Sequence, residues 1–98
     1  MEFEGFEWDA GNIAKCQKHG LSLAEVESAF AARVLIVNDE VNSEAEQRFR
    51  AIGVTASGRH AFIVFTLRGR RLRPLSARYM HRKEIDRYEK NNPDVQER

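Results

Sequence analysis

The hydrophobic period of this chain changes near residue 33, and that change limits the folds it can adopt. Over about residues 10–32 apolar residues recur every three to four positions, whereas from residues 34–37 to 79 they follow the spacing of strands. The first spacing is typical of amphipathic helices and the second of a sheet. Short turns separate the later strand runs, so we expect an antiparallel sheet with helices packed on it, an α+β fold.

Two helices are predicted in succession before that change. Asp9 is placed to cap the first, over residues 10–19, which a glycine then ends. Ser22 and Glu25 have the S-x-x-E spacing of a capping box, which predicts a second helix that runs to about residue 32.

The strands are predicted from alternation and turn residues. Pro74 cannot donate a ladder hydrogen bond, so its strand lies at a sheet edge or carries a bulge. The run over residues 60–67 is apolar on both faces, which favours a central strand. With a last helix over about residues 81–91 the expected order is β-α-α-β-β-β-β-α, its strands falling at residues 3–8, 34–37, 47–55, 60–67 and 71–79.

The composition predicts one cytoplasmic domain, over residues 1–91, and a polar C-terminal tail, over residues 92–98. A single cysteine, Cys16, rules out an internal disulfide and a thiolate metal cage. The acidic start does not resemble a signal peptide, and no apolar run approaches the ~18–20 residues needed to span a bilayer.

Charge is divided between the two halves of the chain. Residues 1–47 carry ten acidic and three basic side chains, and residues 48–98 carry thirteen basic and five acidic ones. Eleven of those thirteen are arginines, whose planar fork grips phosphate in a bidentate way. The split favours a phosphate-bearing or acidic partner, although solvated surface charge is the alternative.

Arginine placement within the sheet gives two expectations that conflict. The charge split predicts that Arg48, Arg50, Arg73 and Arg78 share one concave surface, away from most of the acidic residues of the first half. Strict alternation along residues 71–79 instead places Arg73 and Arg78 on opposite sides of their strand.

Several chemistries have no support in the sequence. It has no P-loop, no dinucleotide glycine fingerprint and no H-E-x-x-H motif, and its three histidines are scattered, so we expect neither a metal nor a cofactor. Metal-independent acid–base cleavage of a phosphodiester needs only a base, an acid and a fixed cation. RNA supplies its own nucleophile, the 2′-hydroxyl.

Three segments spread over about residues 3–90 carry a family resemblance: FEWDAGNIAKCQKHGLSLAEVESAF, QRFRAIGVTASGR and RPLSARYMHRKEIDRYE. In combination they resemble the BrnT toxin family. The chain departs from many relatives at Pro74, where they have an aliphatic residue, and at His81, where they have a hydroxyl residue. The matching positions are Trp8, Asp9, Lys18, His19, Gly20, Glu46, Arg48, Ile52, Gly53, Ser76, Ala77, Arg78, Glu84 and Tyr88.

The resemblance implies a bacterial type II toxin, similar to the RelE ribonuclease toxins, that cleaves RNA without a metal and inhibits translation. It implies a BrnA-like antitoxin with a ribbon-helix-helix region as partner, and contact with operator DNA only through that antitoxin. A compact antiparallel sheet flanked by helices is the implied fold.

We therefore predict that Arg78 and Arg48 stabilise the charge of the phosphorane and that Glu46 or His81 moves protons. Contacts with RNA are predicted for Arg50, Arg73 and Tyr88. Each arginine could instead form a surface ion pair, Glu84 could cap its helix, and Tyr88 could be a core residue. Rival functions are a module that binds nucleic acid without cutting it, and a protein-interaction domain that meets only an acidic partner.

Overall fold

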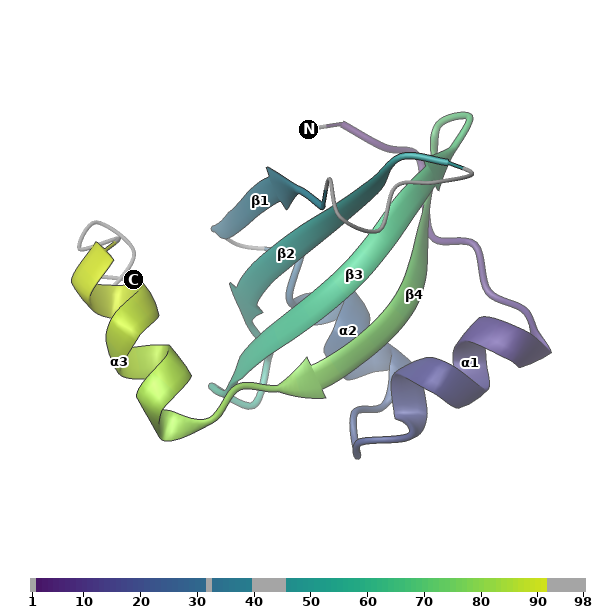
Figure 1. The fold of residues 1–98 in the computed structure, drawn as a ribbon. Helices are drawn as coiled ribbons and strands as arrows, with labels where there is room; N and C mark the ends of the chain where they lie inside the picture. Colours follow the sequence, from purple (N-terminus) through teal and green to yellow (C-terminus); the bar gives the residue numbers. More distant parts are fainter. Residues whose placement is uncertain (1, 32, 40–45, 92–98) are drawn as a thin grey trace.

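The computed structural model describes residues 2–31, 33–39 and 46–91 and has the predicted α+β architecture (Figure 1). Four strands form one sheet in the order β1-β2-β3-β4, and every neighbouring pair is antiparallel. The elements are α1 (Ala10–Gln17), α2 (Leu23–Ser28), β1 (Val34–Asn38), β2 (Arg48–Val54), β3 (His60–Arg68), β4 (Arg71–Tyr79) and α3 (Arg82–Asn91).

The helices occupy two different places around the sheet. Figure 1 shows α2 behind the sheet, α1 at the lower right beside the edge strand β4, and α3 set apart at the left, following β4. The core lies between the sheet and the first two helices, where Val26 of α2 and Ala29, just after it, belong to the same buried cluster as Ile63 and Phe65 of β3. As predicted, β3 is central. The described residues include no helix long and apolar enough to cross a membrane.

The expected strand over residues 3–8 is reduced to a single bridge, so the expected element order was wrong at its start. Phe6 pairs in parallel with Leu72 of β4. Backbone bonds beside this bridge run from Leu72 N to the Gly5 oxygen and from Glu7 N to the Leu72 oxygen, both at 2.9 Å. Gly5 has a φ of 151°, outside the strand region, so the segment follows the edge of β4 without forming a full strand.

Both helix starts were predicted at the right residues, but the caps differ in detail. The Asp9 carboxylate accepts hydrogen bonds from the Gly11 and Asn12 backbone, and the Asn12 side chain accepts one from Asp9 N, which completes a capping box. Ser22 Oγ accepts from Glu25 N at 3.1 Å. The Glu25 carboxylate contacts β4 and the β2–β3 turn rather than serving as the predicted capping-box partner.

Both helices end earlier than predicted, α1 at Gln17 and α2 at Ser28. After α2 the backbone tightens into bonds from Phe30 N to the Glu27 oxygen and from Ala31 N to the Ser28 oxygen. Such i→i+3 bonds commonly replace the α-helical pattern at a helix end. Three predicted features lie outside the described residues. They are the end of the second helix at residue 32, the acidic connection over residues 40–45 between two strands, and the tail over residues 92–98.

Gly53 lies within β2, where it pairs with Val34 of β1 and Ala61 of β3. A Cβ atom at this position would lie 2.3 Å from the Ala29 carbonyl oxygen. Glycine is therefore required because the end of α2 lies directly against β2.

A bulge in β4 resolves the conflict over the arginine faces. The β3–β4 register shifts between Val64, which pairs with Ser76, and Phe65, which pairs with Pro74. Leu75 is thus the extra residue, and the side-chain alternation changes phase there. Pro74 lies beside it on an edge strand, as predicted.

The phase change places all four arginines on one face of the sheet. Thr66 of β3 lies between Arg48 and Arg73, and Phe62 lies between Ile52 and Arg78. Strict alternation was therefore wrong for the second half of β4, and the expectation of a shared face was right.

Candidate active site

The acidic half of the chain neutralises much of this arginine face. Arg50 pairs with Asp39 at 3.3 Å, and Arg73 pairs with Asp9 at 2.9 Å. Glu7 and Glu46 both pair with Arg68, and Glu4 pairs with Arg70. The prediction that these arginines lie away from most of the first half's carboxylates fails at Glu7, Asp9 and Asp39. Glu7 and Asp9 reach Arg73 because the segment before α1 follows β4.

Arg73 is the most enclosed of these cations. Its side chain is 12% exposed, and its guanidinium contacts both Glu7 and Asp9. The hydrogen bond with Asp9 is the main reason its pKa lies above the ordinary value. An RNA phosphate would have to break these pairs to reach Arg73, so the observed contacts favour a role in holding the first segment to β4.

Tyr88, the third predicted RNA contact, is buried. It is 6% exposed, and its ring meets that of His60 edge-on at a centroid distance of 5.9 Å. His60 also pairs with Glu89 at 3.5 Å. These contacts hold α3 against the sheet and support the core interpretation of Tyr88.

Arg78 is held differently, by a partner from the helix that follows it. Its two terminal nitrogens each donate to one oxygen of Glu84 at 2.8 Å. Its guanidinium carbon lies 4.9 Å from the centre of the Phe62 ring, and its side chain remains 36% exposed. The result is a cation with a fixed orientation that solvent still reaches.

Glu84 has two structural tasks. Besides holding Arg78, it accepts a hydrogen bond from the His81 backbone at 2.9 Å, which confirms the interpretation of Glu84 as a cap. The Arg78 bonds first, and the His81 bond second, lower the pKa of Glu84 from 4.5 to about 2.

We expect the free-energy advantage of the parent chain over Glu84→Gln to be present at neutral pH and to shrink as the pH falls from 4.5 toward about 2. A carboxylate whose pKa is lowered by folding contributes stability above its unfolded pKa, and loses it as it is protonated in the folded state. Urea unfolding at several pH values measures this difference. Asp86→Asn, which removes an exposed pair with Arg82, is the control and should show little pH-dependent change. If the difference in unfolding free energy between the parent and Glu84→Gln stays constant down to pH 2, the ion pair of Glu84 with Arg78 is not its cause.

Beside Arg78 lies a hollow of about 390 Å³ built from segments far apart in the sequence. The corner between α1 and α2, the β2–β3 turn, the end of β4 and the start of α3 all contribute to it. The described residues that line it are His19, Arg59, Arg78, Tyr79, Met80 and His81.

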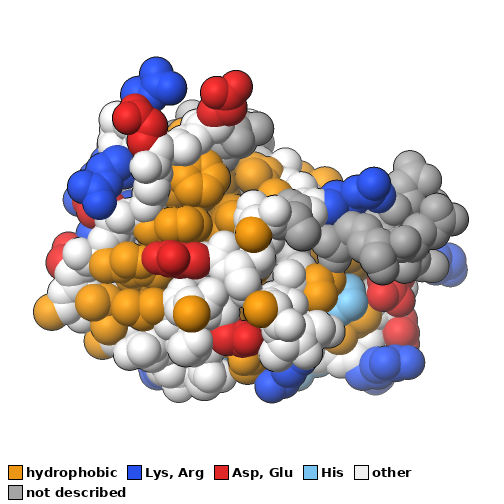
Figure 2. Space-filling model, turned by 180° about the vertical axis from the view of Figure 1, so that it is seen from behind, with side chains coloured by type: hydrophobic (Ala, Val, Ile, Leu, Met, Phe, Trp, Pro, Cys, Tyr) orange, Lys and Arg blue, Asp and Glu red, His pale blue; other side chains and the backbone are white. Residues whose placement is uncertain are grey.

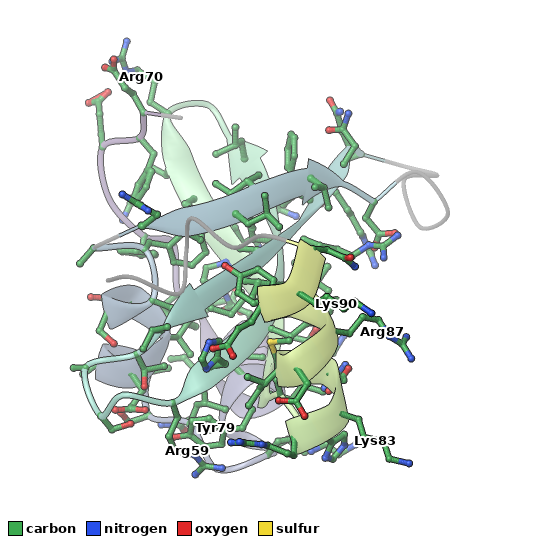
Figure 3. The ribbon with its side chains drawn as sticks, turned by 90° about the vertical axis from the view of Figure 1, so that its left-hand side faces the viewer. Arg59, Arg70, Tyr79, Lys83, Arg87 and Lys90 are labelled. Atoms are coloured by element: carbon green, nitrogen blue, oxygen red, sulfur yellow. The ribbon has the colours of Figure 1, made fainter. Side chains whose placement is uncertain are left out.

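Arg59 and Tyr79 form a fixed unit within this hollow. The Arg59 guanidinium carbon lies 3.5 Å from the centre of the Tyr79 ring, a cation–π geometry. Tyr79 in turn donates to Glu25 Oε2 at 2.9 Å, and this bond is the main cause of the lowered pKa of Glu25. Burial, and then the bond with Glu25, raise the pKa of Tyr79. Figure 3 shows Arg59 beside Tyr79 at one end of the sheet, with Arg70 at the other.

The predicted catalytic residues are divided between the two ends of the sheet. Arg78 and His81 line the hollow, whereas Glu46 pairs with Arg68 beside the β3–β4 hairpin. Arg48 lies opposite Thr66, and Arg78 lies opposite Phe62, which is ~13 Å farther along β3 at ~3.3 Å per residue. The structure therefore brings Arg78 and His81 together but leaves Glu46 and Arg48 apart from them.

Four of the described lining residues were absent from the predicted site: His19, Arg59, Tyr79 and Met80. His19 stands in the K-H-G sequence that carries part of the family resemblance, which was the available signal for it. Arg59 lies in a turn, and no pattern in the sequence marks it. Among the described residues no group of three or more His, Cys, Asp or Glu side chains could hold a metal ion.

The opposite surface has a different character. Seen from behind in Figure 2, hydrophobic side chains predominate, with isolated acidic residues among them and lysines and arginines at the margins. Phe3, Phe6, Trp8 and Phe30 are among the partly buried hydrophobic residues that pack against the core. This surface does not suit a phosphate ligand, which directs attention to the hollow at the end of β4.

A comparison with protein-family models matches residues 8–84 to the family described as "Ribonuclease toxin, BrnT, of type II toxin-antitoxin system". The match covers α1 through the start of α3, including every residue that lines the hollow. A comparison with curated proteins gave no match.

Proposed function

The chain belongs to the BrnT family of ribonuclease toxins of type II toxin–antitoxin systems, and on that basis we propose that it cleaves RNA internally, without a metal ion, and so inhibits translation in the cytoplasm. A BrnA-like antitoxin with a ribbon-helix-helix region is proposed as its partner, and operator DNA is contacted only through that antitoxin. The α+β arrangement of the chain suits a relationship with RelE-type toxins.

One observation carries the placement of the active site. Arg78 is fixed by two 2.8 Å bonds to Glu84 and still faces a hollow whose other described lining residues include no carboxylate. A guanidinium has five N–H donors, so binding one carboxylate does not exhaust it. One further N–H of Arg78 reaches the Tyr79 backbone oxygen at 3.4 Å. We propose that the donors left after these bonds contact a phosphate.

In the proposed reaction the 2′-oxygen of a ribose attacks the adjacent phosphorus, and the P–O5′ bond breaks. Negative charge grows on the non-bridging oxygens in the transition state, where a fixed cation stabilises it more than it stabilises the ground state. Arg78 is that cation, and His81 moves a proton. Because Arg48 lies at the other end of the sheet, we propose that it contacts neighbouring nucleotides together with Arg50.

Labelled RNA incubated with the partner-free protein tests this function. We expect internal cleavage that continues in excess EDTA and yields a 2′,3′-cyclic phosphate and a 5′-hydroxyl. RNA that is bound but stays intact would identify a non-catalytic binding module. The absence of any RNA affinity would identify a protein-interaction domain, and cleavage abolished by EDTA would disprove metal independence.

A further inference from the structure

The hollow at the end of β4 contains two histidines as well as two arginines. His19 comes from the corner after α1, and His81 from the residue just before α3. The third histidine, His60, pairs with Glu89 and lines a neighbouring hollow of about 380 Å³. Imidazole has an ordinary pKa of ~6.5, so two such groups can supply an acid and a base together near neutral pH.

A second cavity also places His19 close to Arg78. A smaller cavity of about 100 Å³ is lined by His19 and Arg78 together with Phe62, Ser76 and Ala77. The position of His19 is set by the turn at Gly20, where φ is 100° and the backbone N–H bonds to the Gln17 oxygen at 3.0 Å. A residue with a side chain would adopt that φ at a cost, so the glycine keeps the corner in place.

The lining chemistry points to one ligand class. Arg59 and Arg78 are both anchored by other residues of the chain, through Tyr79 and Glu84 respectively. Two fixed cations with no carboxylate among the described lining residues favour an anion. Tyr79 and Met80 add surface that a nucleobase can contact. A phosphodiester with its attached nucleotides has both features.

We propose that His19 and His81 are the acid–base pair of RNA cleavage and that Arg59 binds the scissile phosphate beside Arg78. This inference rests on the proposed function. One histidine, neutral, takes the proton from the 2′-hydroxyl as the O2′–P bond forms. The other, protonated, gives its proton to O5′ as the P–O5′ bond breaks. Electrons and protons balance without a further reactant, and the products are a 2′,3′-cyclic phosphate and a 5′-hydroxyl.

Single substitutions measure the contribution of each histidine. We expect His19→Ala and His81→Ala each to lower the single-turnover cleavage rate by about 10²–10⁴-fold, as expected for loss of a general acid or base. RNA affinity should stay within about threefold of the parent value, since the arginines remain. Lys15→Ala, which removes an exposed cation of α1 outside the lining, is the control and should cleave at close to the parent rate.

A substrate with sulfur in place of O5′ separates acid from base. A thiolate leaves without protonation, so this RNA should restore the rate of one histidine variant and leave the other slow. If the sulfur-containing RNA restores the cleavage rate of both histidine variants, or of neither, the proposed acid–base pair is wrong. Because a structural defect would affect both substrates alike, selective rescue also excludes mere unfolding.

Arg59→Ala tests the phosphate contact. Loss of a charge-assisted contact should weaken RNA binding by about 10–100-fold. Arg70→Ala, at the other end of the sheet, should weaken it much less. The two proposals fail in different ways. A folded parent chain that cuts no RNA contradicts the proposed function. If the parent cuts RNA and both histidine variants cut it equally fast, only the proposed acid–base pair is contradicted.

Discussion

Arg78→Ala should lower the rate of RNA cleavage by about 10²–10³-fold, by analogy with removal of one fixed donor from a charged transition state. Arg78 is held by Glu84 and by the end of β4, so its donors need no reorganisation when charge develops on the phosphate. Single-turnover cleavage of labelled RNA measures the effect. Arg78→Lys should recover little activity, because an ammonium cannot bind Glu84 and a phosphate in the same planar geometry.

The control is Arg70→Ala, which removes an exposed arginine at the opposite end of the sheet (Figure 3). Its side chain is 73% exposed, so its loss should change the cleavage rate little. Arg78→Ala also leaves Glu84 without its partner, and the double variant Arg78→Ala/Glu84→Gln separates that effect from catalysis. If folded Arg78→Ala, checked by circular dichroism, cleaves as fast as the parent, the active site lies elsewhere even though the family membership stands.

The strands and turns could be predicted because their signals are local. Alternation and turn residues placed β4 at its observed bounds, Arg71–Tyr79, and β3 within one residue. The first segment could not be predicted in the same way. Whether residues 3–8 become a full strand depends on how Gly5 meets the edge of β4, which is a tertiary contact.

The bulge shows how one residue can reverse a prediction. Pro74 correctly indicated an edge or a bulge, but it does not say which neighbouring residue is the extra one. The shift opposite Leu75 moved Arg78 to the face that Arg73 occupies. Side-chain direction has a period of two, so any such insertion exchanges the faces of every later residue in the strand.

The charge split can be read from the sequence, but the sequence does not show which charges pair within the fold. Opposite charges in two halves of a chain can face a partner or face each other. Here Glu7 meets Arg68 and Arg73 within the fold. Only the path of the segment before α1 decides between these outcomes, and that path is set by backbone bonds to β4.

Family motifs marked two of the four residues proposed for the site, Arg78 in the S-A-R sequence and His19 in the K-H-G sequence. His81 departs from the family pattern, and Arg59 is not among the matching positions. His19 and Arg59 reach the same hollow from a helix corner and a hairpin turn. No sequence period links these positions, because their proximity follows from packing α1 and α2 against the sheet.

Expressed alone in bacteria, the parent chain should stop growth, and Arg78→Ala, at equal soluble level, should be tolerated far better. An enzyme that turns over damages many RNA molecules per copy, so even a small free fraction is harmful. Growth after induction, with protein level measured by blotting, gives the result. Normal growth with abundant, folded parent protein would contradict the toxin function.

Neutralisation should instead depend on stoichiometry. An antitoxin acts by binding, so at a free concentration of about 1,000 Kd it leaves about 0.1% of the toxin free. Growth should therefore recover sharply once the co-expressed antitoxin exceeds this chain in amount, and the two proteins should co-purify. If the antitoxin binds a surface outside the hollow, Arg78→Ala should bind it as tightly as the parent chain does. If the antitoxin fills the hollow, Arg78→Ala should bind it more weakly than the parent. Pull-down with Arg59→Ala and Arg78→Ala distinguishes the two, because a partner seated in the hollow contacts both fixed arginines and must lose affinity with each.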